Sequence, residues 1–272
     1  IRDSNTTNAN VSFNTSDVKL ASGANLTVDT DSGNSGNIEF QGSIHGTGNT
    51  ANTVTDITSL DAGGGTVTVN AIDANIEDIS ITGVTTLKGD ITTASDGTVT
   101  ITGNTTSQGD NTIDTKTGGG ANVTITGTLN ANATTDDLDI NAGTGTIEIT
   151  GDIAGSTAFA TIDLNAVAAG DGTTTGAVTL GGDIGVTGTA GAGATNIGNN
   201  DTTGAITLSG DMYHTSGALA IKGGSYAVGN NSTLSTIKTT GNIAVEFGSN
   251  DVTVRAGGLT VDIGGNANIT FG

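Results

Sequence analysis

The sequence predicts an all-β protein folded as a right-handed parallel β-helix (a β-solenoid) of about nine irregular rungs. Three observations predict it: a phrase of alternating β-branched and polar residues recurs along the chain, Gly, Asn and Asp separate the phrases, and Pro is absent. Gly and Asn supply the positive-φ corners that such a coil needs, whereas Pro would remove a main-chain donor from an interior strand. We therefore expect short parallel strands and almost no helix.

Residues 1–35 are expected to form an N-terminal opening rung or cap. They contain two alternating apolar and polar runs, residues 11–13 and 26–28, among polar turn residues. Repeat arrays need atypical ends, because an exposed terminal strand is a template for further pairing. We accordingly place an opening segment at 1–35 and the β-helix repeat array at 36–272.

The best copy of the repeated phrase is GTIEITGDIAG, at residues 145–155. Read with a period of two, Ile147 and Ile149 point to one side and Glu148 to the other. Further copies begin at residues 36, 65, 97, 121, 176, 204, 241 and 267, so turns of variable length absorb insertions at modest cost. Each rung is expected to hold about three short strands. Aligning the phrases predicts an inward ladder of Val67, Val99, Val123, Ile147, Val178 and Ile206.

The net charge of −20 arises from 27 acidic and only seven basic residues, which are scattered singly. No basic patch is available for phosphate backbones, so the composition excludes nucleic-acid binding. Two interpretations of the acidity remain open: solubility through mutual repulsion, or cation binding. No run of apolar residues is long enough for a transmembrane helix, so no membrane span is expected.

Residues suited to catalysis are scarce, and we predict a non-enzymatic protein with no catalytic residues. Cys is absent, and the two histidines, His45 and His214, have no nucleophile or carboxylate partner in a recognisable motif. The competing interpretation is a polysaccharide-active enzyme, because some β-helical lyases and hydrolases gather carboxylates on one face. Its candidates are Asp136, Asp137, Asp139 and Glu148, although their regular place in the repeat favours rung-surface residues.

Calcium is the one cofactor to which the sequence points. Several turns offer the hard oxygen donors that Ca²⁺ prefers, and the candidate metal ligands are Asp29, Asp31, Asp171 and Asp201. The tandem GGxGxD nonapeptides of calcium β-rolls are missing, however. The alternative is that these residues only form turns, as Asp commonly does.

Four longer segments show the same alternation of apolar and polar residues: LDAGGGTVTV (60–69), ISITGVTTLKGDITT (79–93), LDINAGTGTIEITGDI (138–153) and residues 162–184. They resemble the repeat-rich β-helical exoproteins of Gram-negative bacteria: filamentous-haemagglutinin-like adhesins, autotransporter passengers and giant β-strand-repeat surface proteins. The resemblance implies an extracellular location at the surface of a Gram-negative bacterium. It also implies cell-surface polysaccharide, or a host or other cell surface, as partners. The family's secretion-domain signatures are not found in the sequence.

The predicted function is structural: self-assembly, head to tail or laterally, into a cell-surface filament, sheath or layer such as an S-layer. The strand at residues 268–271 ends without a visible cap, and an open β-helix end is a template for another strand. A head-to-tail contact of this kind propagates into a homopolymer. The alternative is the monomeric stalk of an adhesin. Since residue 1 is Ile, we also expect the chain to be a portion of a longer protein.

Overall fold

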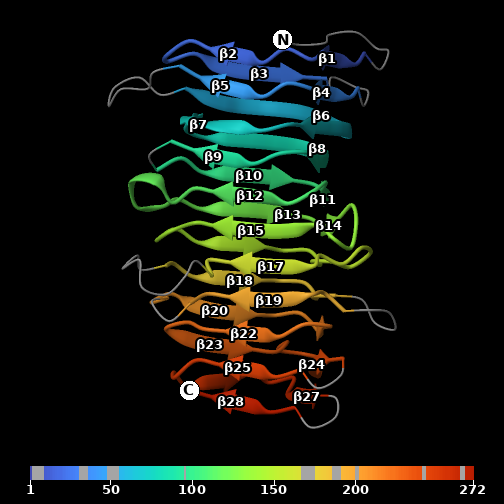
Figure 1. Cartoon of the computed structure of the whole chain (residues 1–272), viewed down its shortest axis with the longest axis vertical. Coiled ribbons are helices and arrows are strands. Elements are labelled where there is room, and N and C mark those ends of the chain that lie inside the picture. Colours follow the sequence, from blue (N-terminus) through green and yellow to red (C-terminus); the bar gives the residue numbers. More distant parts are fainter. Residues whose placement is uncertain are drawn as a thin grey trace.

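The protein is a tall stack of β-rungs, with the N-terminus at one end and the C-terminus at the other (Figure 1). This computed structural model describes residues 1, 9–30, 36–47, 55–94, 96–166, 175–185, 191–199, 202–240, 243–263 and 267–272. Strands account for nearly all its regular structure, and the one helical turn among the described residues is the 3₁₀ element η1 (Thr117–Gly119). The predicted all-β parallel solenoid of about nine turns is confirmed.

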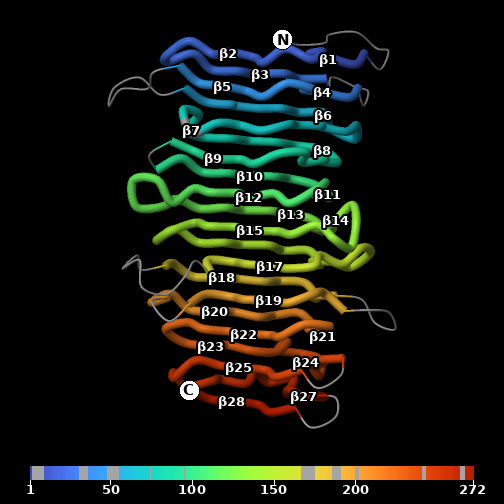
Figure 2. The backbone as a smooth tube through the Cα atoms, in the orientation of Figure 1, coloured from blue at the N-terminus to red at the C-terminus, as the bar shows by residue number. Residues whose placement is uncertain are grey.

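Within the described residues, every strand pairing is parallel and the strands stack in three columns. Each rung runs through the first, second and third columns in turn before the chain rises to the next rung (Figure 2). The predicted opening segment supplies β1 (Val11–Phe13), β2 (Val18–Leu20) and β3 (Asn25–Asp29), one strand for each column.

Along the chain, short strands alternate with Gly-, Asn- and Asp-rich turns, and each strand adds to one of the three columns. The first column continues with β4 (Ile38–Phe40), the end of β6 (Asp56–Val69), the end of β8 (Ile79–Leu87), β11 (Thr105–Ser107), β14 (Leu129–Ala131), β21 (Met212–Thr215), β24 (Ser235–Thr239) and β27 (Leu259–Ile263). The second continues with β5 (Ile44–Gly46), β7 (Ile72–Ile76), β9 (Ile91–Thr93), β12 (Asn111–Asp114), β15 (Asp137–Asn141), β17 (Thr161–Leu164), β19 (Ala194–Ile197), β22 (Leu219–Ile221), β25 (Val245–Phe247) and β28 (Ile269–Phe271). The third continues with the starts of β6 and β8, then β10 (Val99–Thr102), β13 (Val123–Thr126), β16 (Ile147–Ile149), β18 (Val178–Leu180), β20 (Ala205–Leu208), β23 (Ser225–Val228) and β26 (Val252–Val254).

Two strands pass from the third column into the first without interruption. β6 and β8 are 14 and nine residues long, and β8 turns the corner at Gly83, whose φ is +130°. Glycine tolerates this backbone conformation because it has no Cβ. The third column and the first column as far as β14 are thereby joined into a single 14-stranded sheet. The later first-column strands β21, β24 and β27 form a separate three-stranded sheet, and the second column forms a sheet of 11 strands.

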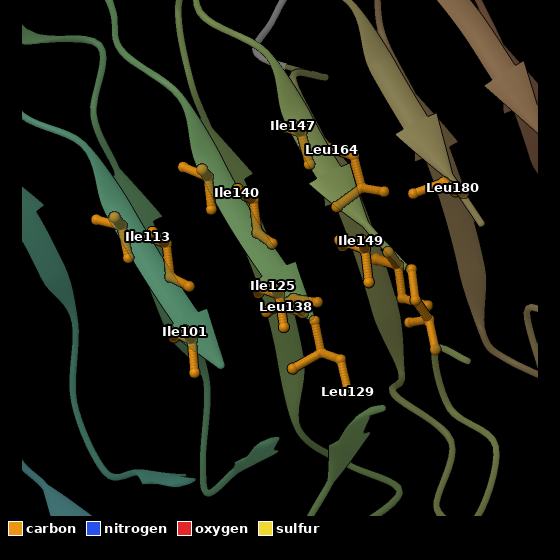
Figure 3. Packing of buried hydrophobic residues seen from close by; sticks show 14 of the residues in the cluster. Ile101, Ile113, Ile125, Leu129, Leu138, Ile140, Ile147, Ile149, Leu164 and Leu180 are labelled. Atoms are coloured by element: carbon orange, nitrogen blue, oxygen red, sulfur yellow. The ribbon is translucent and has the colours of Figure 1, made fainter. Parts of the chain in front are cut away.

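The core lies inside the coil, where apolar side chains from facing columns meet in rows (Figure 3). Ile101, Ile125 and Ile149 project from the third column, and Ile113 and Ile140 from the second; all are fully buried. Stacking identical branched side chains at successive rungs buries apolar surface on every turn, which is the main stabilising term of a solenoid.

All six residues of the predicted inward ladder are fully buried, but only five of them share one column. Val99, Val123, Ile147, Val178 and Ile206 are direct neighbours in the third column. Val67 is also fully buried, but it lies in the first column between Ile38 and Thr85. The phrases have one local pattern, yet turns of different length carry them to different columns.

Candidate functional site: an acidic groove on the second column

Of the four predicted calcium ligands, the structure describes Asp29 alone. Asp31, Asp171 and Asp201 lie outside the described residues. Asp29 ends β3, and its backbone N–H donates to the Ile1 carbonyl over 3.0 Å. In the part of the chain that the structure describes, no group of three or more His, Asp or Glu side chains is arranged to hold a metal ion.

Several Asp and Asn side chains at the rung corners accept a hydrogen bond from the backbone of the next rung. From the sequence they were predicted only to form turns. The Oδ1 atom of Asp78 accepts the backbone N–H of Thr98, one rung further on, over 2.8 Å. The same inter-rung contact is made from Asn10, Asp17, Asn37, Asn122 and Asp152 to residues 37, 43, 66, 146 and 183. Each satisfies a main-chain donor that would otherwise lack a partner at the strand entrance.

Acidic side chains nevertheless gather in one place, on the outer face of the second column. A groove of about 430 Å³ crosses the rungs there. Its lining residues come from β12, β15, β17 and the turns before β9 and β12, and they are Asp90, Asp110, Asn111, Thr112, Asp137, Leu138, Asp139, Thr161 and Asp163. Five carboxyl groups therefore share one concave surface in which Leu138 is the one apolar residue.

Two of these carboxyl groups accept hydrogen bonds from backbone N–H groups. Asp90 Oδ1 accepts the N–H of Thr112 over 2.8 Å, and Asp110 Oδ1 accepts the N–H of Asp137 over 3.0 Å. Both thus make the corner contact described above, which fixes them at the rim of the groove.

Asp139 and Asp163 lie at the centre of the groove as direct register neighbours on β15 and β17. The Nδ2 group of Asn141 donates to Asp139 Oδ2 over 3.0 Å, and the Nδ2 group of Asn196 donates to Asp163 Oδ1 over 2.7 Å. Adjacent strands in a sheet are about 4.8 Å apart, so two like charges meet at close range.

Burial raises the pKa of Asp139 from an ordinary value near 3.8 to about 6. The hydrogen bond from Asn141 and the charge of Lys116 lower this pKa, while the charges of Asp163 and Asp114 raise it further. A carboxyl group that titrates near neutrality is suited to bind or donate a proton, and it is also a typical signature of functional sites. Asp139 is therefore the residue of the groove with the most unusual chemistry.

Of the four carboxylates named from sequence, Asp137 and Asp139 reach the groove and two do not. Asp136 is only 7% exposed, and its Oδ2 accepts the backbone N–H of Ala133 over 2.9 Å. Glu148 lies on β16 in the third column, between Thr124 and Thr179. The sequence analysis missed Asp90, Asp110 and Asp163 as members. The available signal was an Asp before or inside each of the four successive strands β9, β12, β15 and β17, which becomes visible only once these strands are assigned to one column.

The two histidines lie outside this groove. His45 is on β5 and contacts two carboxylates of neighbouring rungs. His214 is buried on β21, where its Nε2 is 2.8 Å from the Oγ1 of Thr240.

No helix among the described residues is long and apolar enough to cross a membrane. No protein-family model, curated protein or solved structure matches the chain. A function for this chain must therefore be inferred from the geometry of the rod and of its acidic groove.

Proposed function

We propose that this chain is a non-enzymatic, extracellular structural protein that self-assembles head to tail or laterally into a cell-surface filament, sheath or layer. Three inward rows that continue from rung to rung through the described residues support the proposal. They run from Val11 to Val261 in the first column, from Val18 to Phe271 in the second and from Leu26 to Val252 in the third. A continuous ladder of this kind makes a stiff rod.

Apolar side chains at the last rung supply the contact for assembly. Phe271 is 65% exposed, Val254 48% and Ile269 38%. Phe271 already stacks on Phe247, with ring centroids 5.4 Å apart, and at the other end Phe13 stacks on Phe40 at 4.4 Å. A rung placed on β26, β27 and β28, from more of the same polypeptide or from a second copy, would cover these side chains and pair the open strand edges.

The acidic surface sets the conditions for association. A charge of −20 on one chain repels a second chain side by side, and salt or divalent cations weaken that repulsion. End-to-end contact through apolar rows is affected less. The same repulsion favours the alternative of a monomeric adhesin stalk, which would remain an isolated rod.

Electron microscopy of the purified chain with Ca²⁺ and with EDTA tests the proposal. Filaments or sheets are expected, and their loss in EDTA would place a metal ion at the contacts. Phe271→Asp should abolish assembly, whereas Leu234→Asp, at a side chain that is 59% exposed in the turn before β24, should preserve it. Isolated short rods in both buffers would reject self-assembly in favour of the stalk.

The acidic groove favours a second candidate, a polysaccharide-active enzyme. Its five carboxyl groups and the raised pKa of Asp139 are the features expected of acid and base catalysis on a β-helix. Against it, ligand sites are usually lined by apolar and aromatic side chains, and this groove contains Leu138 alone. Release of reducing sugar from bacterial or plant polysaccharides, abolished by Asp139→Asn, would establish the enzyme.

A further inference from the structure

His45 joins the first three rungs of the rod at the second column. Its Nδ1 is 2.7 Å from Oδ2 of Asp73 on β7, and its Nε2 is 3.4 Å from Oδ2 of Asp17, which precedes β2. The imidazole thus lies between two carboxylates, one on the rung before and one on the rung after. About one third of the His45 side chain is exposed, as the value of 32% indicates.

The backbone holds both carboxylates in place independently of the histidine. Asp17 Oδ1 accepts the N–H of Ser43 over 3.0 Å. Asp73 Oδ1 accepts the N–H of Gly46 over 3.1 Å and the N–H of Asn75 over 3.0 Å. Each carboxylate therefore uses one oxygen to complete a rung corner and presents the other to the ring.

A neutral imidazole carries one N–H and one lone pair, whereas the imidazolium carries two N–H groups. With carboxylate oxygens facing both nitrogens, the neutral ring can donate to one of them only, and its lone pair then faces the other anion. Only the imidazolium turns an N–H toward both carboxylates. We propose that His45 is a protonation-dependent clamp that ties the first three rungs together when its ring is charged and releases the Asp17 contact when the ring is neutral.

The groups around His45 define how the clamp responds to pH. Three charged groups surround the ring: the carboxylates of Asp17 and Asp73, and the ammonium group of Lys19, the exposed register neighbour of His45 on β2. Burial raises the pKa of Asp73, but hydrogen bonds from His45, Asn75 and Gly46 outweigh burial and leave that pKa below its ordinary value. Asp73 consequently stays ionised into the acidic range.

The clamp is closed only when the ring is protonated and both carboxylates are ionised. Its contribution is therefore present in mildly acidic solution, is lost in alkaline solution, where an imidazole is neutral, and is lost again in strong acid, where carboxylates are protonated. Raising the pH from about 5.5 to 8 should loosen rungs one to three and leave unchanged those rungs that contain neither His45 nor Asp139, whose own pKa of about 6 lies in this range.

Amide hydrogen exchange on the full chain, followed by NMR, tests this inference. Exposed ion pairs are typically worth a two- to fivefold change in an equilibrium, so exchange of the Ser43 amide, corrected for intrinsic rate, should be about two- to fivefold faster at pH 8 than at pH 5.5. The Thr98 amide is the internal control: its N–H donates to Asp78 in the same way, and neither histidine contacts Asp78. Ring ¹⁵N shifts of His45, read against His214, report the protonation state directly.

Two variants separate the clamp from simple folding effects. Asp17→Asn keeps an oxygen for the Ser43 N–H but removes the charge, so it should abolish the pH dependence and retain protection of Ser43. His45→Gln should do the same without a titrating group. The inference is overturned if Ser43 exchange in the unmodified chain is independent of pH, or if the dependence persists in Asp17→Asn.

Discussion

Replacing Asp139 with Asn should stabilise the protein at neutral pH, although the substitution removes a charge from a hydrogen-bonded site. The pKa of Asp139 is about 6, compared with an ordinary value near 3.8. An acid whose pKa is raised in the folded state binds its proton more tightly there than in the unfolded chain. Ionised Asp139 is therefore a destabilising group, and stability must fall as pH rises from about 4 to about 6.

The size of the effect follows from the shift. Two pKa units correspond to about 3 kcal/mol if the group is fully shielded, and solvent screening of this partly exposed carboxylate reduces the expected cost to about 1–1.5 kcal/mol. Asn keeps an oxygen that can accept the hydrogen bond from Asn141, and its amide can donate to Asp163. Asp139→Asn should thus gain about 1 kcal/mol at pH 7 and nothing at pH 4.

Chemical denaturation at a series of pH values measures the free energy of unfolding of both proteins, and so gives the gain at pH 7 and its absence at pH 4. Because a solenoid can unfold in parts, amide exchange of β15 and β17 should be read in parallel with the global transition. Glu148→Gln, which removes an exposed carboxylate from the third column, is the matched control and should change neither stability nor its pH dependence. Loss of stability in Asp139→Asn at pH 7, or an unchanged slope between pH 4 and 6, would refute the assignment of ionised Asp139 as a destabilising, partly buried charge.

Three further pairs of substitutions test the register, the corners and the caps. Ile147→Asp places a charge in the fully buried row between Val123 and Val178. It should lower the free energy of unfolding by on the order of 3–5 kcal/mol, against about 1 kcal/mol for Ile147→Val. Unchanged thermal or chemical unfolding of Ile147→Asp would contradict the register. At Gly127, where φ is +147°, a Cβ would lie 2.4 Å from the Gly103 carbonyl oxygen, so Gly127→Ala should cost about 1–3 kcal/mol. Gly109→Ala, with φ of +89° and open space around the new Cβ, should cost less, and equal losses would remove the steric explanation. Asp78→Ala should cost about 1 kcal/mol and Asp78→Asn almost nothing, because either Asp or Asn can accept the Thr98 N–H; equal losses in the two variants would mean that charge, not capping, is what Asp78 supplies.

The acidic groove was only half predictable from the sequence. Asp137 and Asp139 stand two residues apart on one strand, so a period of two places them on the same face. Asp163 joins them because β17 pairs with β15 in a register that spans a turn of irregular length. Asp136 was misleading, since its side chain turns back to cap Ala133, and Glu148 belongs to a phrase that lies in another column.

The sequence by itself determined the parallel solenoid, its lack of helix and the inward direction of residues such as Val67 and Ile147. These properties follow from strand alternation and from glycine and asparagine corners, which are local. Only the tertiary structure decided to which column each phrase belongs: the phrase at residue 65 enters the first, that at 145 the third and that at 267 the second. It also decided the pKa of Asp139 and the position of His45 between Asp17 and Asp73. These depend on contacts between rungs separated by more than 20 residues, and the length of each intervening turn sets them.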